Sequence, residues 1–124
     1  MRKIIALVAA LALAAPILAA KGDMSVATFL AKAEALKAKG WGAIGSPDIK
    51  LLRDEGTAAG AAYRARIESD KKAGNAPHSC PPKKAAMKSD VFMAHLQSYP
   101  VSVRPKTSIK MATFDLMKKR YPCK

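Results

Sequence analysis

Four side chains in this sequence could bind a metal or act as a nucleophile with its base: Cys80, Cys123, His78 and His95. Zinc sites usually show short Cys-x-x-Cys or His-x-x-x-His spacings, which are absent here, and a cysteine nucleophile needs a free thiol. The even cysteine count and the prolines that flank both cysteines instead favour one structural crosslink. We therefore predict a Cys80–Cys123 disulfide, with no metal site, no cofactor and no catalytic residue.

Two adjacent acids, Asp54 and Glu55, form the remaining pair with the chemistry of a general acid and base. Adjacent positions on a helix point about 100° apart, so the two carboxyl groups would not converge on one substrate. We therefore expect both on a solvated helix face. His95 stands beside Leu96 in a predicted helix, where we expect it to be half-buried and structural.

The first 20 residues have the pattern of a secretory signal peptide. Arg2 and Lys3 precede an apolar run from Ile4 to Ala15, and small residues follow at positions 19 and 20. The run is shorter than the roughly 20 residues that span a bilayer, so a membrane anchor fits less well. We predict a signal peptide at 1–20 and a single helical domain at 21–124, periplasmic or secreted, with no membrane span after signal removal.

The chain is strongly basic, with 22 lysines and arginines, nine acids and a formal net charge of +13. The charge is lopsided, because the segment from residue 83 to residue 124 has ten basic residues and only Asp90 and Asp115 as acids. Such a charge in the cytoplasm would suggest nucleic acid. For an exported protein it favours acidic proteins, anionic lipids or cell-wall polymers instead.

Apolar residues at helical spacing predict an all-α fold, a small four-helix domain with one disulfide. The predicted helices span residues 25–39, 47–73, 89–99 and 108–121, the last capped by Thr107 or Ser108. Ser46 followed by Pro47 is a typical helix start. Pro122 ends the last helix, so the disulfide would tie that end to the loop before the third helix.

Three features of the chain concern packing between the predicted helices. Trp41 and Ile44 lie in a glycine-rich linker, and we expect them to pack on the core. Small residues, Gly56, Ala59, Gly60 and Ala62, occupy the middle of the second helix, which predicts that another helix crosses close to its backbone there. The six methionines are typical of an adaptable groove, although their places in apolar helix stripes favour the core.

Basic residues cluster in two loops of the C-terminal half. We predict that these loops lie at one end of the helical bundle and form a rigid cationic surface that meets an acidic partner, with residues His78, Lys83, Lys84, Lys88, Arg104 and Lys106. The alternative is that these are ordinary solvated side chains on a basic protein.

Four features of the second half occur together: Cys80-Pro81, a short helix ending at Tyr99-Pro100, a capped helix after it, and the terminal Tyr121-Pro122-Cys123. In these features roughly residues 58–123 resemble the Rap/Tai-type immunity proteins of type VI secretion. Members of that family are small exported all-helical proteins that block cell-wall amidase effectors in the periplasm.

The resemblance implies a non-catalytic protein whose partner is a secreted cell-wall hydrolase, inhibited by occlusion of its active site. The disulfide would then hold the loop from His78 to Lys88 in shape, so that little ordering entropy is lost on binding. The alternative is a cationic envelope protein that binds anionic lipid, lipopolysaccharide or peptidoglycan. A monomer and a homodimer are both compatible with the sequence.

Overall fold

The computed structural model describes residues 20–84 and 86–124, so nearly all of the predicted signal peptide lies outside the described residues. The described chain forms α1 (Val26–Lys39), the 3-10 helix η1 (Gly40–Ala43), α2 (Pro47–Lys72), α3 (Ser89–Gln97), the 3-10 helix η2 (Arg104–Lys106) and α4 (Ile109–Arg120). The predicted all-α class is confirmed. Across these residues no helix has both the length and the apolar character needed to cross a membrane.

Serine caps set three of the helix starts. Ser25, Ser46 and Ser108 each precede a helix, and each side chain accepts a hydrogen bond from a backbone N–H of the first turn. These caps satisfy donors that have no partner inside the helix. The helix α3 begins at Ser89, and its N-cap Lys88 forms no side-chain hydrogen bond.

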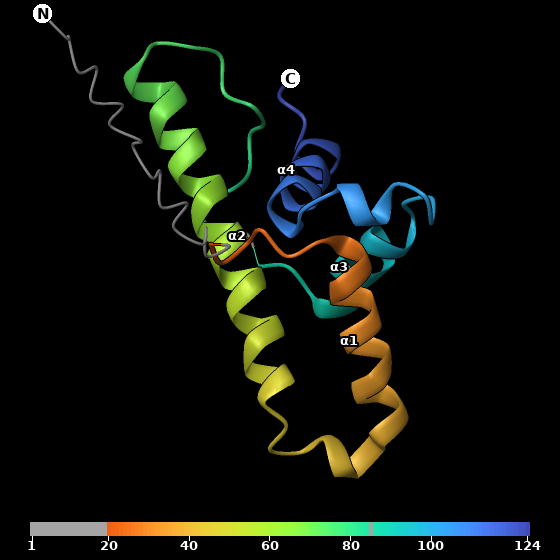
Figure 1. Cartoon of the computed structure of the whole chain (residues 1–124). Helices are drawn as coiled ribbons and strands as arrows, with labels where there is room; N and C mark the ends of the chain where they lie inside the picture. The colour runs from red at the N-terminus through yellow and green to blue at the C-terminus, as the bar shows by residue number, and fades with distance from the viewer. Residues whose placement is uncertain (1–19, 85) are drawn as a thin grey trace, which may run out of the picture.

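The helices α1 and α2 extend from a shared tip formed by η1, and α3 and α4 pack near their other ends (Figure 1). The helix α2 is the longest of the described chain, and its most extensive contact is with α4. The core joins all four helices and comprises Val26, Phe29, Leu30, Ala59, Leu96, Ile109 and Ala112.

The predicted disulfide joins Cys80 to Cys123 and ties the end of α4 to the loop before α3. Both cysteines are exposed, so the crosslink lies at the surface. The two residues are 43 positions apart in the chain. Closing a loop of that size in the unfolded state is worth on the order of 4 kcal/mol by the chain-entropy estimate.

The prediction that Trp41 and Ile44 pack on the core is wrong. Their exposed fractions are 90% and 71%, and Ala43 is the buried residue of η1. The reason is geometric: η1 turns at the far end of the α1–α2 pair, where neither α3 nor α4 reaches to cover it (Figure 1).

The prediction that Glu55 lies on a solvated face is also wrong. Glu55 is 5% exposed, and its carboxylate accepts hydrogen bonds from the backbone N–H groups of Gly22 (2.6 Å) and Met24 (3.4 Å). Its neighbour Asp54 is more exposed, and there a hydrogen bond from Lys50 (2.6 Å) lowers the pKa of the Asp54 carboxyl. Glu55 therefore fastens the segment before α1 onto α2.

His95 joins α3 to α4 and is half-buried, as predicted. Its Nε2–H donates to the carbonyl of Ala112 (2.9 Å). The Tyr99 hydroxyl lies 3.1 Å from the same nitrogen and donates to the carboxylate of Asp115 (2.7 Å). Burial lowers the pKa of His95 and raises the pKa of the Tyr99 hydroxyl.

Replacing Glu55 with alanine should lower the free energy of unfolding by about 2 kcal/mol, because two backbone donors lose a buried charged acceptor. Asp54→Ala is the matched control and should cost less, since it removes a partly exposed ion pair. Urea unfolding followed by circular dichroism measures both variants. Equal losses would contradict the role assigned to Glu55.

The lowered pKa of His95 predicts a pH dependence of stability. Below pH 6.5, the ordinary pKa of histidine, His95 binds a proton in the unfolded state but not in the folded state. The free energy of unfolding therefore falls as the pH drops from 6.5 towards the pKa that His95 has in the folded protein. His95→Gln keeps a donor for Ala112 but does not titrate. Urea unfolding at pH 7 and at pH 5.5 should show a larger decrease for the wild type, and identical decreases would contradict the prediction.

Candidate binding groove and its anchored loop

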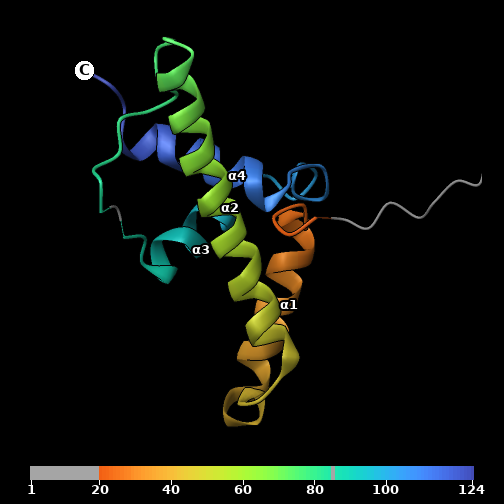
Figure 2. The same ribbon diagram turned by 90° about the vertical axis from the view of Figure 1, so that its left-hand side faces the viewer.

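A groove of about 910 Å³ runs along one face of α2. Its other walls are residues 81–83 and 87–93, which lie before and at the start of α3, and residues 113–117 of α4. Figure 2 shows α3 beside α2, on the other side of α2 from η2. The lining is mainly apolar and includes Leu52, Tyr63, Ile67, Pro81, Pro82, Met87, Phe92, Met93, Leu116 and Met117. The three methionines suit an adaptable binding surface.

Two glycines of α2 leave room in this groove. Gly56 and Gly60 both line it, and a methyl group added at either glycine would meet no other atom within 4 Å. The predicted close helix crossing is therefore absent at Gly56 and Gly60. The tight approach is at Ala59, which is fully buried and lies against the backbone of Gly22.

The charge along the groove is mostly positive. We call Arg53, Arg64, Lys71 and Lys83 the cationic edge, and Glu68 is the one acid among the lining residues. Lys71 approaches Glu68 (3.9 Å) on the exposed side of α2, whereas the other three cations form no ion pair with the residues that the structure describes. The groove thus combines an apolar floor with a positive edge.

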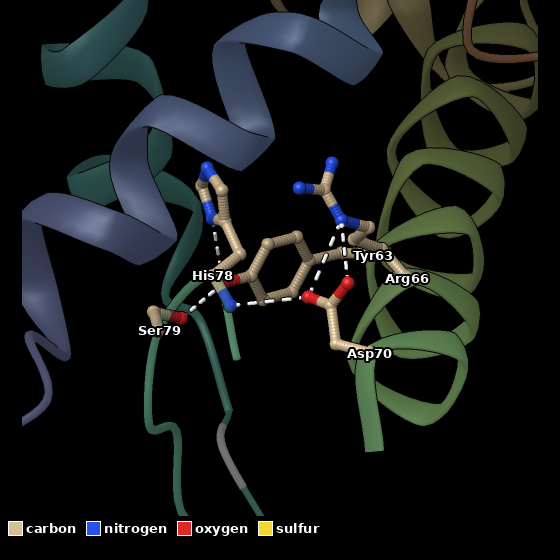
Figure 3. A network of polar contacts seen from close by, with 5 residues as sticks. All are labelled: Tyr63, Arg66, Asp70, His78 and Ser79. Carbon is tan, nitrogen blue, oxygen red and sulfur yellow. Dashed lines mark hydrogen bonds and ion pairs between the residues drawn. The ribbon is translucent and has the colours of Figure 1, made fainter. Parts of the chain in front are cut away.

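The loop that leads into the groove wall is held on α2 by buried and partly buried polar contacts, shown in Figure 3. The Tyr63 hydroxyl bonds to the hydroxyl of Ser79 and lies 3.2 Å from His78 Nδ1. The Asp70 carboxylate accepts from the backbone N–H of His78 (3.2 Å) and from Arg66 Nε (3.2 Å). We call these five residues the loop anchor.

Aromatic packing and the crosslink add to the loop anchor. Phe114 of α4 packs edge-on against the Tyr63 ring at 5.0 Å between centroids, and His78 lies against both rings. Directly after the anchor, the backbone N–H of Cys80 donates to the carbonyl of Tyr121 (2.8 Å), beside the disulfide. The loop is therefore held at three consecutive positions before the prolines of the groove wall.

The loop anchor contains a serine, a histidine and an aspartate, but their geometry differs from that of a catalytic triad. The Ser79 hydroxyl is buried against Tyr63, and the His78 ring meets Tyr63 rather than Ser79. Asp70 contacts the backbone of His78 and not its ring. A triad needs a nucleophile hydrogen-bonded to its base and a base oriented by the acid, so the arrangement describes a structural fastening.

The six residues predicted as one cationic surface fall into two groups. Lys83, Lys84 and Lys88 are exposed in the loop before α3, and Lys83 lines the groove. His78 belongs to the loop anchor. The loop of residues 100–108, which carries the remaining two residues, lies on the opposite side of α2 in Figure 2.

Arg104, in the loop of residues 100–108, stabilises the end of α3. Its Nε donates to the carbonyl of Tyr99 (2.9 Å) and its terminal nitrogen donates to the carbonyl of Gln97 (2.8 Å). Carbonyls at the end of a helix have no partner within it, and a cation there also complements the helix dipole. Arg104 therefore closes the end of α3, while Lys106 is exposed in η2.

Sequence reasoning missed the cationic residues on α2. Arg53, Arg64 and Lys71 are 11 and 7 positions apart, and both spacings return to the same face of a helix of 3.6 residues per turn. Gly60 and Ile67 fall on the same face. The helical spacing of these cations is therefore visible in the sequence. It indicates a binding face only together with the open space beside Gly56 and Gly60, which the structure shows.

No protein-family model, curated protein or solved structure matches this chain significantly. Within the described residues, histidine, cysteine and acidic side chains do not gather into a group of three that could hold a metal ion. The groove with its cationic edge, and the loop anchor that fixes one of its walls, form the candidate binding site of this chain.

Tyr63→Phe should lower the free energy of unfolding by about 1–2 kcal/mol, because the buried Ser79 hydroxyl loses its partner. It should also speed hydrogen exchange at the backbone N–H groups of His78 and Cys80 in the oxidised protein. The matched control is Tyr121→Phe, since the Tyr121 hydroxyl makes no hydrogen bond to the described residues. Equal exchange rates in the two variants would contradict the loop anchor.

Proposed function

We propose that this chain is an exported, non-catalytic binding protein that inhibits a secreted cell-wall hydrolase in the periplasm. The observation that carries the proposal is a 910 Å³ apolar groove with a cationic edge, one wall of which is a loop fixed by a disulfide and buried hydrogen bonds. The likeness of the C-terminal half to Rap/Tai-type immunity proteins supports the choice of partner.

The fixed loop supports a role in tight binding. A loop that is already ordered loses little conformational entropy on association, and that loss is a major cost of binding. The disulfide and the loop anchor hold residues 78–80, and Pro81 and Pro82 restrict the chain that follows. The loop would thus meet its partner in nearly its final shape.

The charges suggest which part of the partner binds. Lys83, Lys84 and Lys88 stand exposed beside the groove, and Arg53 and Arg64 lie across it on α2. A partner segment with apolar side chains flanked by carboxylates would complement this surface. Such charges mainly raise the association rate and exclude wrong partners, while the apolar contacts hold the complex together. In this mechanism, the loop covers the active-site cleft of the hydrolase as the partner segment enters the groove.

The first test is affinity capture on the oxidised protein from envelope extracts of its own and neighbouring bacteria, with washes at about 0.15 and 0.5 M salt. The captured fraction is then assayed for hydrolysis of dye-labelled peptidoglycan with and without added protein. We expect a hydrolase that survives the high-salt wash and is inhibited.

Two variants locate the site. Gly60→Leu places a bulky side chain in the groove, and a triple Lys→Glu change at 83, 84 and 88 reverses the loop charge. Each should weaken inhibition by about tenfold or more, a factor that corresponds to about 1.4 kcal/mol. The control is Ala65→Leu, which adds the same side chain to an exposed position of α2 outside the groove.

Two results would overturn the proposal. Full inhibition by Gly60→Leu and by the triple charge reversal would rule out this surface as the site. Recovery of cell-wall polymer or lipid alone, lost at 0.5 M salt where the Debye length is under about 5 Å, would instead indicate a protein that binds the envelope by charge.

A further inference from the structure

The tip of the α1–α2 pair carries the most exposed large apolar side chains of its half of the molecule. Trp41, the single tryptophan of the chain, and Ile44 lie largely in solvent, and Leu51 is exposed one turn into α2. Within the described residues no other element covers them, because η1 lies at the far end from α3 and α4 (Figures 1 and 2). An exposed apolar cluster of this kind marks an interaction surface.

Two lysines precede this cluster in the chain. Lys37 and Lys39 occupy the exposed last turn of α1, immediately before the glycine that begins η1. The nearest acids in the chain are Glu34, which is exposed on α1 three positions before Lys37, and Asp48, which pairs with Lys32 at 3.4 Å, so residues 37–44 carry two lysines and no acid. The tip therefore presents apolar side chains with a local excess of positive charge.

The backbone of the tip leaves these side chains room to move. Trp41 stands between Gly40 and Gly42, and a methyl group added at either glycine, or at Gly45, would meet no other atom within 4 Å. The indole therefore projects from a turn that no neighbouring side chain crowds.

The size and chemistry of the tip select its partner. A stable protein interface buries about 800 Å² on each side and is built from some 20 residues, whereas this tip offers two or three apolar side chains on one narrow turn. Tryptophan prefers the boundary between lipid and water, and lysines near an anionic bilayer are attracted to it. We propose that residues 37–44 dock the protein on the surface of a membrane that contains anionic lipid, with Trp41 and Ile44 at the acyl boundary and the two lysines among the headgroups.

This docking site is separate from the groove and does not depend on the proposed function. The α1–α2 pair holds the tip at one end of the molecule, while residues 75–83 lie towards the other end (Figure 1). A protein docked by its tip would therefore stand on the membrane with its loop anchor directed away from the lipid.

The single tryptophan makes the test specific, because its emission reports on the tip whatever else binds. The full chain, oxidised, is mixed with vesicles of phosphatidylglycerol and phosphatidylcholine at 3:7, or with phosphatidylcholine alone. With the anionic vesicles, Trp41 emission should shift to the blue, become less accessible to acrylamide and be quenched by brominated acyl chains. Salt at about 0.5 M should weaken the shift.

Variants measured by co-sedimentation with the same vesicles complete the test. Trp41→Ser and a double Lys→Glu change at 37 and 39 should each reduce binding by about fivefold or more. The controls are Val101→Ser, an exposed apolar side chain elsewhere, and a double Lys→Glu change at 118 and 119 on α4, and both should bind as the wild type does. Circular dichroism checks that each variant keeps its helices.

The proposal fails if Trp41 emission is unchanged by anionic vesicles, even when the protein sediments with them, since binding would then use another surface. It also fails if Trp41→Ser and the control Val101→Ser lose binding equally. Neither result bears on inhibition by the groove, so the two proposals fail separately.

Discussion

Tyr63 is the residue at which α2, α4 and the proline-rich loop meet. Its ring is 2% exposed and packs on Phe114, and its oxygen meets the buried hydroxyl of Ser79. A buried hydroxyl without a partner is costly, so the loop has one position in which both oxygens are satisfied. The groove wall, the exposed lysines and the site of the disulfide all follow from that position.

Helix positions were readable from the sequence because their causes are local. Ser25, Ser46 and Ser108 indicate helix starts because their own side chains cap the first turn, and proline and glycine indicate the ends. The predictions for Trp41, Gly60 and Glu55 fail because their causes are not local. Whether an apolar side chain is covered, a glycine is crowded or a carboxylate finds a buried donor depends on which distant segment arrives there, and periodicity carries no such information.

The candidate site was predicted in part for the same reason. The loop with Lys83, Lys84 and Lys88 and its crosslink were read from neighbouring residues in the chain. The opposite edge of the groove belongs to α2, and the guanidinium of Arg104 is engaged by carbonyls at the end of α3. The net charge of each half of the sequence therefore does not predict where positive charge gathers on the surface, because the cations that line the groove come from both halves.

The segment before α1 lies against the start of α4. The backbone N–H of Val26 donates to the carbonyl of Thr107, and Ile109 and Lys110 donate to the carbonyls of Met24 and Gly22. Partners so far apart in the chain meet only after nearly all of it has been synthesised. During synthesis on the ribosome the fold therefore stays open until α4 emerges. The contact between the segment before α1 and the start of α4 is therefore the last part of this fold that can form.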